Sequence, residues 1–241
     1  DQYDLMSNSV GFNNGKVVML NNYINPNFSG SDRIKRSSGN YFNTTSPFVN
    51  AAGGDYSLTP FSPAISGGLA SVSYDGNTVS APTKDINGLS RGALPDLGAI
   101  ENSLNQKLTV AYVSKNGSDS NVGTSASPFL TIQKGIDATS DGDTVLVAPG
   151  TYTENITHTS GTGITLASQY LTTQDTSYIS STIVDGDEDG PVVFMKNSST
   201  SLNLVGLTIT NGGPTEDLQS YTGCSSCVYG GGIYGYQGDS L

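Results

Sequence analysis

The sequence predicts an all-β fold in which short strands are stacked as the successive coils of a solenoid. Gly accounts for 30 of the 241 residues and only 13% of residues are charged, a composition that favours turns and short strands over helices. In the second half of the chain, short β-branched segments alternate with Gly, Asn and Asp turns. Corresponding segments return at intervals of about 20 to 25 residues, and a repeat of that size is typical of a solenoid.

The segments with a strand pattern are rich in Val, Ile, Leu and Thr and are bounded by turn residues. In chain order they are 112–114, 144–147, 164–167, 182–184, 192–195 and 202–209. Asp141–Asp143 and Pro149–Tyr152 are predicted as turns between them. Each coil is expected to add one rung to parallel sheets, with a rise of about 4.8 Å.

One segment before these strands has a helical pattern. Ser127 is a predicted N-cap, followed by Pro128 at the first helical position, where its missing N–H costs nothing. Phe129, Ile132 and Ile136 then recur on one face of the helix. We expect this short amphipathic helix to cover the open top of the coils.

These residues carry a resemblance to a known superfamily. The run from Tyr112 to Ile156 includes Ser127-Pro-Phe, Thr131-Ile-Gln, Gly142-Asp-Thr-Val and Pro149-Gly-Thr-Tyr, and it resembles the capping helix and first coil of right-handed parallel β-helix proteins of the pectate-lyase-like superfamily. Thr182-Ile-Val-Asp-Gly, Leu207-Thr-Ile-Thr-Asn-Gly and Gly230-Gly-Gly-Ile-Tyr are similar to its later coils. The resemblance implies a right-handed parallel β-helix with a short N-terminal capping helix. It leaves the activity open, because that superfamily includes lyases, hydrolases and adhesins.

The first part of the chain resembles the end of such a helix. Gly15–Leu20 and Asn22–Asn25 are predicted as the last strands of that helix. The irregular tail that ends such helices is matched by Tyr41–Asn50 and Gly54–Gly68, followed by a turn at Tyr74–Asn77 and a final turn and strand at Asp96–Glu101. Arg91 is loosely placed before this last segment. A small unrelated β domain is the alternative. The predicted organisation is therefore residues 1–103 as the C-terminal end of one β-helix unit and residues 108–241 as the N-terminal cap and first coils of a second.

The predicted order, in which the end of one β-helix precedes the start of another, has two explanations. The chain is a piece of a long tandem β-helix protein, or its open coil edges are satisfied by head-to-tail self-association or circular closure, since unpaired edges invite pairing. The chain begins with Asp1 and no apolar leader, which suggests a processed product or an excerpt.

The charge of the chain excludes some classes of partner. A formal net charge of −11 and a pI near 4.2, with only ten Lys and Arg, argue against nucleic acid, which requires clustered cations. No apolar run approaches the roughly 20 residues of a membrane span. We expect a secreted or cell-surface protein whose partner is a polysaccharide or surface glycan.

The two cysteines, Cys224 and Cys227, form a Cys-x-x-Cys between Gly-rich stretches. A local disulfide, two free thiols and a metal site remain open as interpretations.

The acidic run Asp185–Gly190 has carboxylates at alternating positions. Asp185, Asp187 and Asp189 are candidate Ca²⁺ ligands, because Ca²⁺ prefers oxygen ligands; a solvated turn is the alternative. The twelfth position of an EF-hand loop would be Lys196, not Glu, so an EF-hand is excluded.

No catalytic set is recognised in the sequence. Lys196 is the one candidate for a lyase base, against an exposed strand-end charge, and His158 is predicted in a surface turn. Tyr221, Tyr229, Tyr234 and Tyr236 are candidates for stacking on sugars, against a role as strand residues. The expected function is polysaccharide binding or scaffold display; a Ca²⁺-assisted polysaccharide lyase, a glycosidase with its catalytic coils elsewhere, and a self-assembling fibre subunit are the alternatives.

Overall fold

The computed structural model describes residues 17–20, 23–24, 34–38, 41–42, 48–74, 77–159, 161–196, 200–214 and 231–236. Side chains are described from residue 48 onward, except for Val72, Tyr74, Asn77, Val79, Lys196 and Tyr236. The protein is mostly β with few helices, and it divides into two compact units, residues 1–108 (unit 1) and 109–241 (unit 2). Each unit is described by itself.

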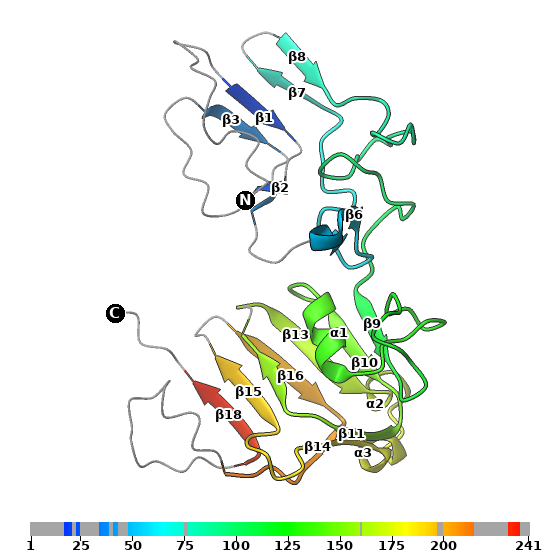
Figure 1. The fold of residues 1–241 in the computed structure, drawn as a ribbon, viewed down its shortest axis with the longest axis vertical. Coiled ribbons are helices and arrows are strands. Elements are labelled where there is room, and N and C mark those ends of the chain that lie inside the picture. Colours follow the sequence, from blue (N-terminus) through cyan, green and yellow to red (C-terminus); the bar gives the residue numbers. More distant parts are fainter. Residues whose placement is uncertain are drawn as a thin grey trace. The chain divides into compact units, whose positions relative to one another are not determined.

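Unit 2 is built from three parallel sheets (Figure 1). The first sheet contains β9 (Val110–Val113), β10 (Thr144–Val147), β13 (Gly163–Ser168) and β16 (Ser201–Val205). The second contains β11 (Gly150–Thr153), β14 (Thr182–Asp185) and β17 (Thr208–Thr210). The third contains β12 (Ile156–His158), β15 (Val193–Lys196) and β18 (Ile233–Tyr236).

The chain visits these sheets in a fixed order. From β10 onward it passes through the first, second and third sheet and then repeats that order through β13–β15 and β16–β18, so that each lap adds one strand to every sheet. All of the pairings within the three sheets are parallel. The parallel, mostly β architecture predicted from the spacing is therefore confirmed.

Apolar columns along the laps form the core of unit 2. In the first sheet, Val145 pairs with Leu166, and both side chains are fully buried. In the third sheet, Ile156 pairs with Val193, and both are again fully buried. In the last described lap, by contrast, Ile233 is 52% exposed. Burial of these columns is the main stabilising contribution of the stack.

Two short strands differ from the sequence prediction. Pro149–Tyr152 was predicted as a turn, but Gly150–Thr153 is β11, because the Tyr152 ring lies in the core with no exposed surface. The surface position predicted for His158 is also wrong. His158 ends β12, is 2% exposed, and places its Nε2 3.0 Å from the carbonyl oxygen of Thr162.

Helix α1 (Ile132–Ala138) packs on β9, β10 and β12 at one end of the stack (Figure 1). A Cβ on Gly135 would lie 2.8 Å from Val145 and 2.9 Å from Val113, so the helix rests directly on the first rungs. The predicted capping helix is confirmed, with Ile132 and Ile136 buried.

The predicted start of this helix is wrong. Thr131, not Ser127, is the N-cap, and its hydroxyl accepts a hydrogen bond from the Lys134 N–H. Phe129 is extended: its N–H donates to Tyr112 and its carbonyl accepts from Ser114, both at 2.9 Å. Pairing with the edge of β9 therefore overrides the local helix signal.

Two short helices, α2 (Tyr170–Thr173) and α3 (Ser177–Ser181), lie between β13 and β14. They contact the first and second sheets, respectively. The sequence pattern does not predict them.

Unit 1 has smaller sheets. Its strands are β1 (Val17–Leu20), β2 (Tyr23–Ile24), β3 (Ile34–Ser38), β4 (Tyr41–Phe42), β5 (Phe48–Asn50), β6 (Asp55–Leu58), β7 (Ser71–Tyr74) and β8 (Asn77–Ser80), with a 3-10 turn, η1, at Ala51–Gly53. The pairs β1–β3 and β2–β4 are parallel, whereas β5–β6 and β7–β8 are antiparallel. A small core contains Leu58, Ala64, Ile65 and Leu97.

Early strands in unit 1 were predicted and are present as β1 and β2. The strand predicted within Asp96–Glu101 is absent, and this segment consists of bends and loop. The N–H groups of Asp96 and Glu101 bond to carboxylates, and that of Leu97 donates to the Ala64 carbonyl at 2.9 Å. Among the described residues, no helix has the length and apolar character needed to cross a membrane.

Candidate functional site

The outer face of the third sheet of unit 2 carries an aromatic pair. Phe194 on β15 lies in register with Thr157 on β12 and with Tyr234 on β18. Because side chains alternate along a strand and the preceding residues Ile156 and Val193 are fully buried, these three side chains point outward. We call Thr157, Phe194 and Tyr234 the third-sheet face.

The two rings of this face are stacked. Their centroids are 6.0 Å apart and their planes differ by 4°. At this separation parallel rings are offset, an arrangement that aromatic pairs prefer over direct overlap. Each ring is half-buried. Offset, half-buried rings present apolar surface at fixed positions, and the strand pairing holds those positions.

Gln133 of α1 completes the head of the third sheet. Its Nε2 donates to the Thr157 carbonyl at 2.9 Å, and its Oε1 accepts from the Thr157 N–H at 2.8 Å. The amide thus makes the two bonds that a further strand would make with β12. The same Nε2 donates to Asp137 Oδ1 at 2.8 Å, which places a carboxylate at the head of the third-sheet face.

An acidic turn leads from the second sheet into β15. Asp187 and Glu188 have φ values of 50° and 59°, and the Asp189 N–H donates to the Gly186 carbonyl at 2.9 Å. These are the features of a type I′ turn. Asp187, Glu188 and Asp189 are exposed. We refer to residues 186–189 as the acidic turn.

Asn155 fixes this turn to the previous lap. Its Nδ2 lies 3.4 Å from the carbonyl oxygen of Gly186, 2.7 Å from that of Asp189 and 3.2 Å from that of Pro191. Asn155 therefore holds both ends of the turn and the segment that leads into β15.

The structure brings some of the predicted site residues together and not others. Tyr234 lies on the third-sheet face. Tyr236 pairs with Lys196, but both side chains lie outside the described residues. Tyr221, Tyr229, Cys224 and Cys227 also lie outside them.

The predicted calcium ligands are on the acidic turn and at its start. Asp185 Oδ1 accepts from the Asp187 N–H at 3.1 Å. Within the described part of the chain, no group of three or more His, Cys, Asp or Glu residues is arranged to hold a metal ion. The Ca²⁺ site of Asp185, Asp187 and Asp189 stays a prediction, as does head-to-tail self-association.

Sequence reasoning missed Phe194 and Gln133. Phe194 follows two Val residues in a segment that was predicted as a strand, but its partner Tyr234 is 40 residues later, whereas Thr157 is 37 residues earlier. Because the laps differ in length, these three residues do not recur at a constant spacing in the sequence. Their alignment is seen only in the strand register.

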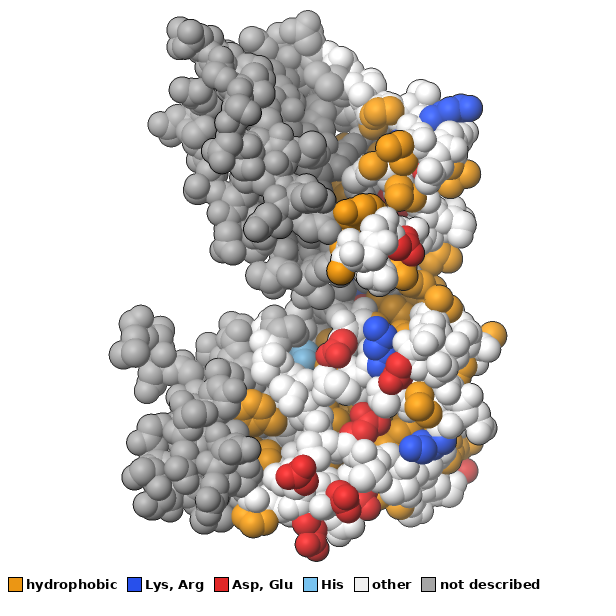
Figure 2. Space-filling model, in the orientation of Figure 1, with side chains coloured by type: hydrophobic (Ala, Val, Ile, Leu, Met, Phe, Trp, Pro, Cys, Tyr) orange, Lys and Arg blue, Asp and Glu red, His pale blue; other side chains and the backbone are white. Residues whose placement is uncertain are grey.

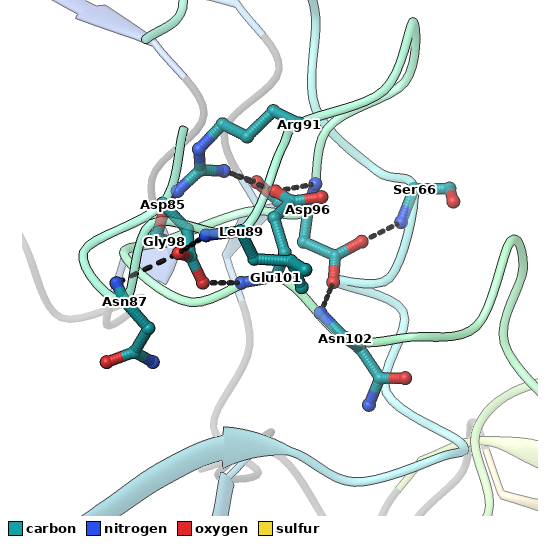
Figure 3. Close-up of polar contacts among 9 residues, drawn as sticks. All are labelled: Ser66, Asp85, Asn87, Leu89, Arg91, Asp96, Gly98, Glu101 and Asn102. Atoms are coloured by element: carbon teal, nitrogen blue, oxygen red, sulfur yellow. Dashed lines mark hydrogen bonds and ion pairs between the residues drawn. The ribbon is translucent and has the colours of Figure 1, made fainter. Parts of the chain in front are cut away.

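A second polar cluster lies in unit 1 and consists of Asp85, Arg91, Asp96 and Glu101 (Figure 3). We call it the carboxylate network. Asp85 accepts hydrogen bonds from the N–H groups of Asn87, Leu89 and Glu101 at 2.9, 2.7 and 3.0 Å. Asp96 accepts from those of Ser66 and Asn102 at 2.7 and 2.6 Å.

Arg91 and Glu101 form a buried ion pair at the centre of the network. Arg91 Nη1 lies 2.5 Å from Glu101 Oε1, with side-chain exposures of 8% and 7%. Arg91 also donates to the carbonyls of Asp96 and Gly98, at 3.1 and 2.8 Å. Arg91, loosely placed by the sequence, therefore holds the final loop of unit 1.

The network shifts two pKa values in opposite directions. The N–H of Glu101 is the main cause that lowers the pKa of Asp85, whereas burial raises the pKa of Glu101, with the nearby carboxylates of Asp96 and Asp85 adding to the rise. Both oxygens of Asp85, both of Asp96 and Oε1 of Glu101 accept hydrogen bonds from the backbone or from Arg91 (Figure 3). The arrangement is that of a structural cluster rather than of a reactive site.

One family model matches part of the chain, the family described as "Protein of unknown function (DUF1565)", over residues 115–160. No curated protein and no solved structure matches the chain.

The matched segment contains the cap of unit 2. Within it, Glu154 accepts hydrogen bonds from the N–H groups of Ile132 and Gln133, both at 3.0 Å. Asp119 accepts from those of Leu130 and Thr131, at 3.0 and 2.9 Å. The matched segment thus spans α1, which closes the head of the stack, and the first lap through β10, β11 and β12.

Proposed function

We propose that unit 2 consists of the capped first coils of a right-handed parallel β-helix similar to those of the pectate-lyase-like superfamily. The fixed order of the three parallel sheets supports this proposal. Crossovers between parallel strands are right-handed in about 98% of cases. The parallel pairs β1–β3 and β2–β4 support the assignment of unit 1 as the end of another such helix.

We further propose that the protein is secreted or displayed on a cell surface and binds a polysaccharide on the third-sheet face. The observation that carries this proposal is the parallel stack of Phe194 and Tyr234. Aromatic side chains supply large apolar contact area at low entropic cost. Paired strands hold both rings, so that little ordering is required on binding.

The groups around the rings suit a hydroxyl-rich ligand. Thr157 lies beside Phe194 in the previous lap, and the acidic turn lies before β15. Hydroxyl groups of a sugar donate well to carboxylates, since hydrogen bonds to charged acceptors are the stronger ones. Apolar rings beside convergent polar groups are the usual composition of a ligand site.

The experiment that tests this function compares variants of the full chain on a panel of soluble polysaccharides. Phe194→Ala and Tyr234→Ala are expected to weaken binding at least about tenfold each, since a stacked aromatic contact of about 1.4 kcal/mol corresponds to that factor. Tyr178→Ala is the matched control, because Tyr178 is a half-buried tyrosine on α3. Affinity electrophoresis and calorimetry provide the readout.

Two results would contradict the function. One is the absence of binding across the panel, which would leave a structural rod or scaffold as the better account. The other is binding that Phe194→Ala and Tyr234→Ala weaken no more than Tyr178→Ala does. In both cases circular dichroism must show that the variants retain the fold.

A further inference from the structure

We infer that the polysaccharide of the third-sheet face is uncharged and that the site excludes polyuronates. This inference rests on the proposed function and specifies the class of ligand. It follows from the distribution of charge between the two units and around this face.

Nearly all of the net charge of the protein lies in unit 2. Residues 1–108 contain 8 Asp and Glu against 7 Lys and Arg, whereas residues 109–241 contain 13 Asp and Glu against 3 Lys, and together these account for the formal charge of −11. Figure 2 shows carboxylate side chains spread over the face of unit 2 that it draws. The unit that carries the aromatic pair is therefore the acidic one.

Carboxylates lie at two borders of the third-sheet face. Asp187, Glu188 and Asp189 are exposed on the acidic turn, and Asp189 is five residues before Phe194. Five residues span at most about 18 Å, which is the length of a few sugars. At the head of the sheet, Asp137 is hydrogen-bonded to Gln133, whose amide rests on Thr157.

The two lysines of unit 2 with described side chains lie against rings of other parts of the unit. The Nζ of Lys134 is 5.9 Å from the centre of the Phe129 ring in the cap, and that of Lys115 is 5.2 Å from the centre of the Tyr152 ring of the second sheet. The third lysine is Lys196 on β15, whose side chain lies outside the described residues. This sheet thus carries one lysine, whereas four carboxylates lie at its borders, those of Asp137, Asp187, Glu188 and Asp189.

A polyuronate carries one carboxylate on each sugar and is repelled by such a border, whereas an uncharged polysaccharide is not. Like charges that face each other across an interface act mainly by suppressing the wrong partner. The repulsion is screened as salt rises, because the Debye length falls from about 30 Å at 0.01 M to about 3 Å at 1 M. The exclusion is therefore expected to weaken with salt.

The test uses the full chain in EDTA with pairs of polysaccharides that share a backbone and differ in charge. Suitable pairs are hydroxyethylcellulose with carboxymethylcellulose, and fully methyl-esterified pectin with polygalacturonate. EDTA removes divalent cations that could bridge carboxylates. We expect the uncharged member of at least one pair to bind at least about tenfold more tightly than its anionic partner at low salt, and the difference to shrink in 0.5 M NaCl, where the Debye length is only about 4 Å.

A triple variant, Asp187→Asn/Glu188→Gln/Asp189→Asn, locates the effect. It is expected to raise the affinity for the anionic member by several fold and to leave that for the uncharged member unchanged. Asp185 is kept, because its carboxylate holds the turn. Asp175→Asn is the control, since Asp175 lies between α2 and α3, which contact the first and second sheets.

Binding of the anionic member as tightly as the uncharged one would overturn this inference and leave the proposed function standing. A difference that persists unchanged in the triple variant would overturn the assignment to the acidic turn and with it the inference. If neither member of any pair binds, the proposed function fails, and this inference fails with it.

Discussion

Unit 2 and the described loop of unit 1 satisfy the same backbone requirement in different ways. In unit 2 each internal strand bonds to a parallel neighbour on both sides, and apolar columns such as Val145–Leu166 fill the interior. In unit 1 the segment 85–102 has no strand, and five of its N–H groups bond to the carboxylates of Asp85, Asp96 and Glu101, namely those of Asn87, Leu89, Asp96, Glu101 and Asn102. Others donate to backbone carbonyls, as Leu97 does to Ala64. Buried N–H groups need partners of one kind or the other.

The difference has consequences for stability. The stability of a stack of apolar columns depends on packing and changes little with pH. The stability of a loop held by buried carboxylates depends on a few charges. Buried ion pairs are costly to desolvate, so that such a cluster contributes little net stability but is very sensitive to the loss of one partner. Substitutions can separate these two kinds of dependence.

The largest effect is expected for Arg91→Met in unit 1. This change leaves Glu101 buried beside Asp85 and Asp96 without its cation. Removing one partner of a buried pair costs about 3–5 kcal/mol. Hydrogen exchange of the Glu101 and Asn102 amides measures the local loss.

Glu101→Gln is the matched control for that change, because it keeps an acceptor and removes the buried charge. Its cost is expected to be clearly smaller than that of Arg91→Met, because Arg91 keeps the nearby carboxylate of Asp85 and its bonds to the carbonyls of Asp96 and Gly98, whereas Arg91→Met leaves only carboxylates. Equal costs would mean that the charge of the pair is not what holds this loop.

Leu166→Ala is expected to destabilise unit 2 by about 3 kcal/mol, since it opens a cavity in a fully buried column. The outward-facing neighbour on the same strand, Thr165, provides the control as Thr165→Ser. Denaturant unfolding followed by hydrogen exchange resolves the two units. Faster exchange in unit 1, or no change in unit 2, would contradict the account of separate cores.

A gain of about 1 kcal/mol is expected for Thr182→Val. The Thr182 hydroxyl is fully buried in unit 2 and has no hydrogen-bond partner in the described part of the chain, and an unpaired buried hydroxyl costs free energy that an isosteric methyl does not. A rise in the melting temperature checks this. A fall would indicate that the hydroxyl has a partner after all.

The smallest effect is expected from the dependence of the stability of unit 1 on pH. Because the pKa of Glu101 is raised in the folded state, this residue contributes stability that is fully present below its ordinary pKa of 4.5. That contribution is lost as pH rises through the pKa of the folded state. Because the pKa of Asp85 is lowered in the folded state, this residue contributes stability that is fully present above its ordinary pKa of 3.8. That contribution is lost as pH falls through the pKa of the folded state. Unit 1 is therefore expected to be most stable near pH 4 to 5.

Thermal melts from pH 3 to pH 7, with Glu101→Gln alongside, measure this profile. In Glu101→Gln the loss of stability above pH 4.5 should disappear, while the loss below pH 3.8 remains. A wild-type profile that rises steadily to pH 7 would show that the direction assigned to Glu101 is wrong.

The sequence was sufficient where a strand is also a run of β-branched residues. Residues 144–147 and 182–184 were predicted because they are rich in β-branched residues and are bounded by turns, and they form β10 (Thr144–Val147) and most of β14 (Thr182–Asp185). Gly150–Thr153 was missed because Pro149-Gly150 is a turn signal, and only the burial of Tyr152 within the stack makes it a strand. Local propensity loses to tertiary packing in such short segments.

The candidate sites were less predictable than the fold. Tyr234 was identified, but its partner Phe194 depends on a register across laps of unequal length. The carboxylate network joins residues as far apart as Ser66 and Asp96 through backbone N–H groups, and hydrogen bonds to the backbone leave no periodic pattern in a sequence. The pattern of residue types in a sequence therefore does not show the register of strands from distant laps. It also does not show which backbone groups a carboxylate binds.

The central claim is that the third sheet stacks Thr157, Phe194 and Tyr234 in parallel register. Interstrand nuclear Overhauser effects in isotope-labelled protein test it most directly. The account predicts contacts between amide and α protons that link 157 to 194 and 194 to 234 in a parallel pattern. Close contacts between α protons of opposed residues, which antiparallel strands give at their non-hydrogen-bonded pairs, would contradict it.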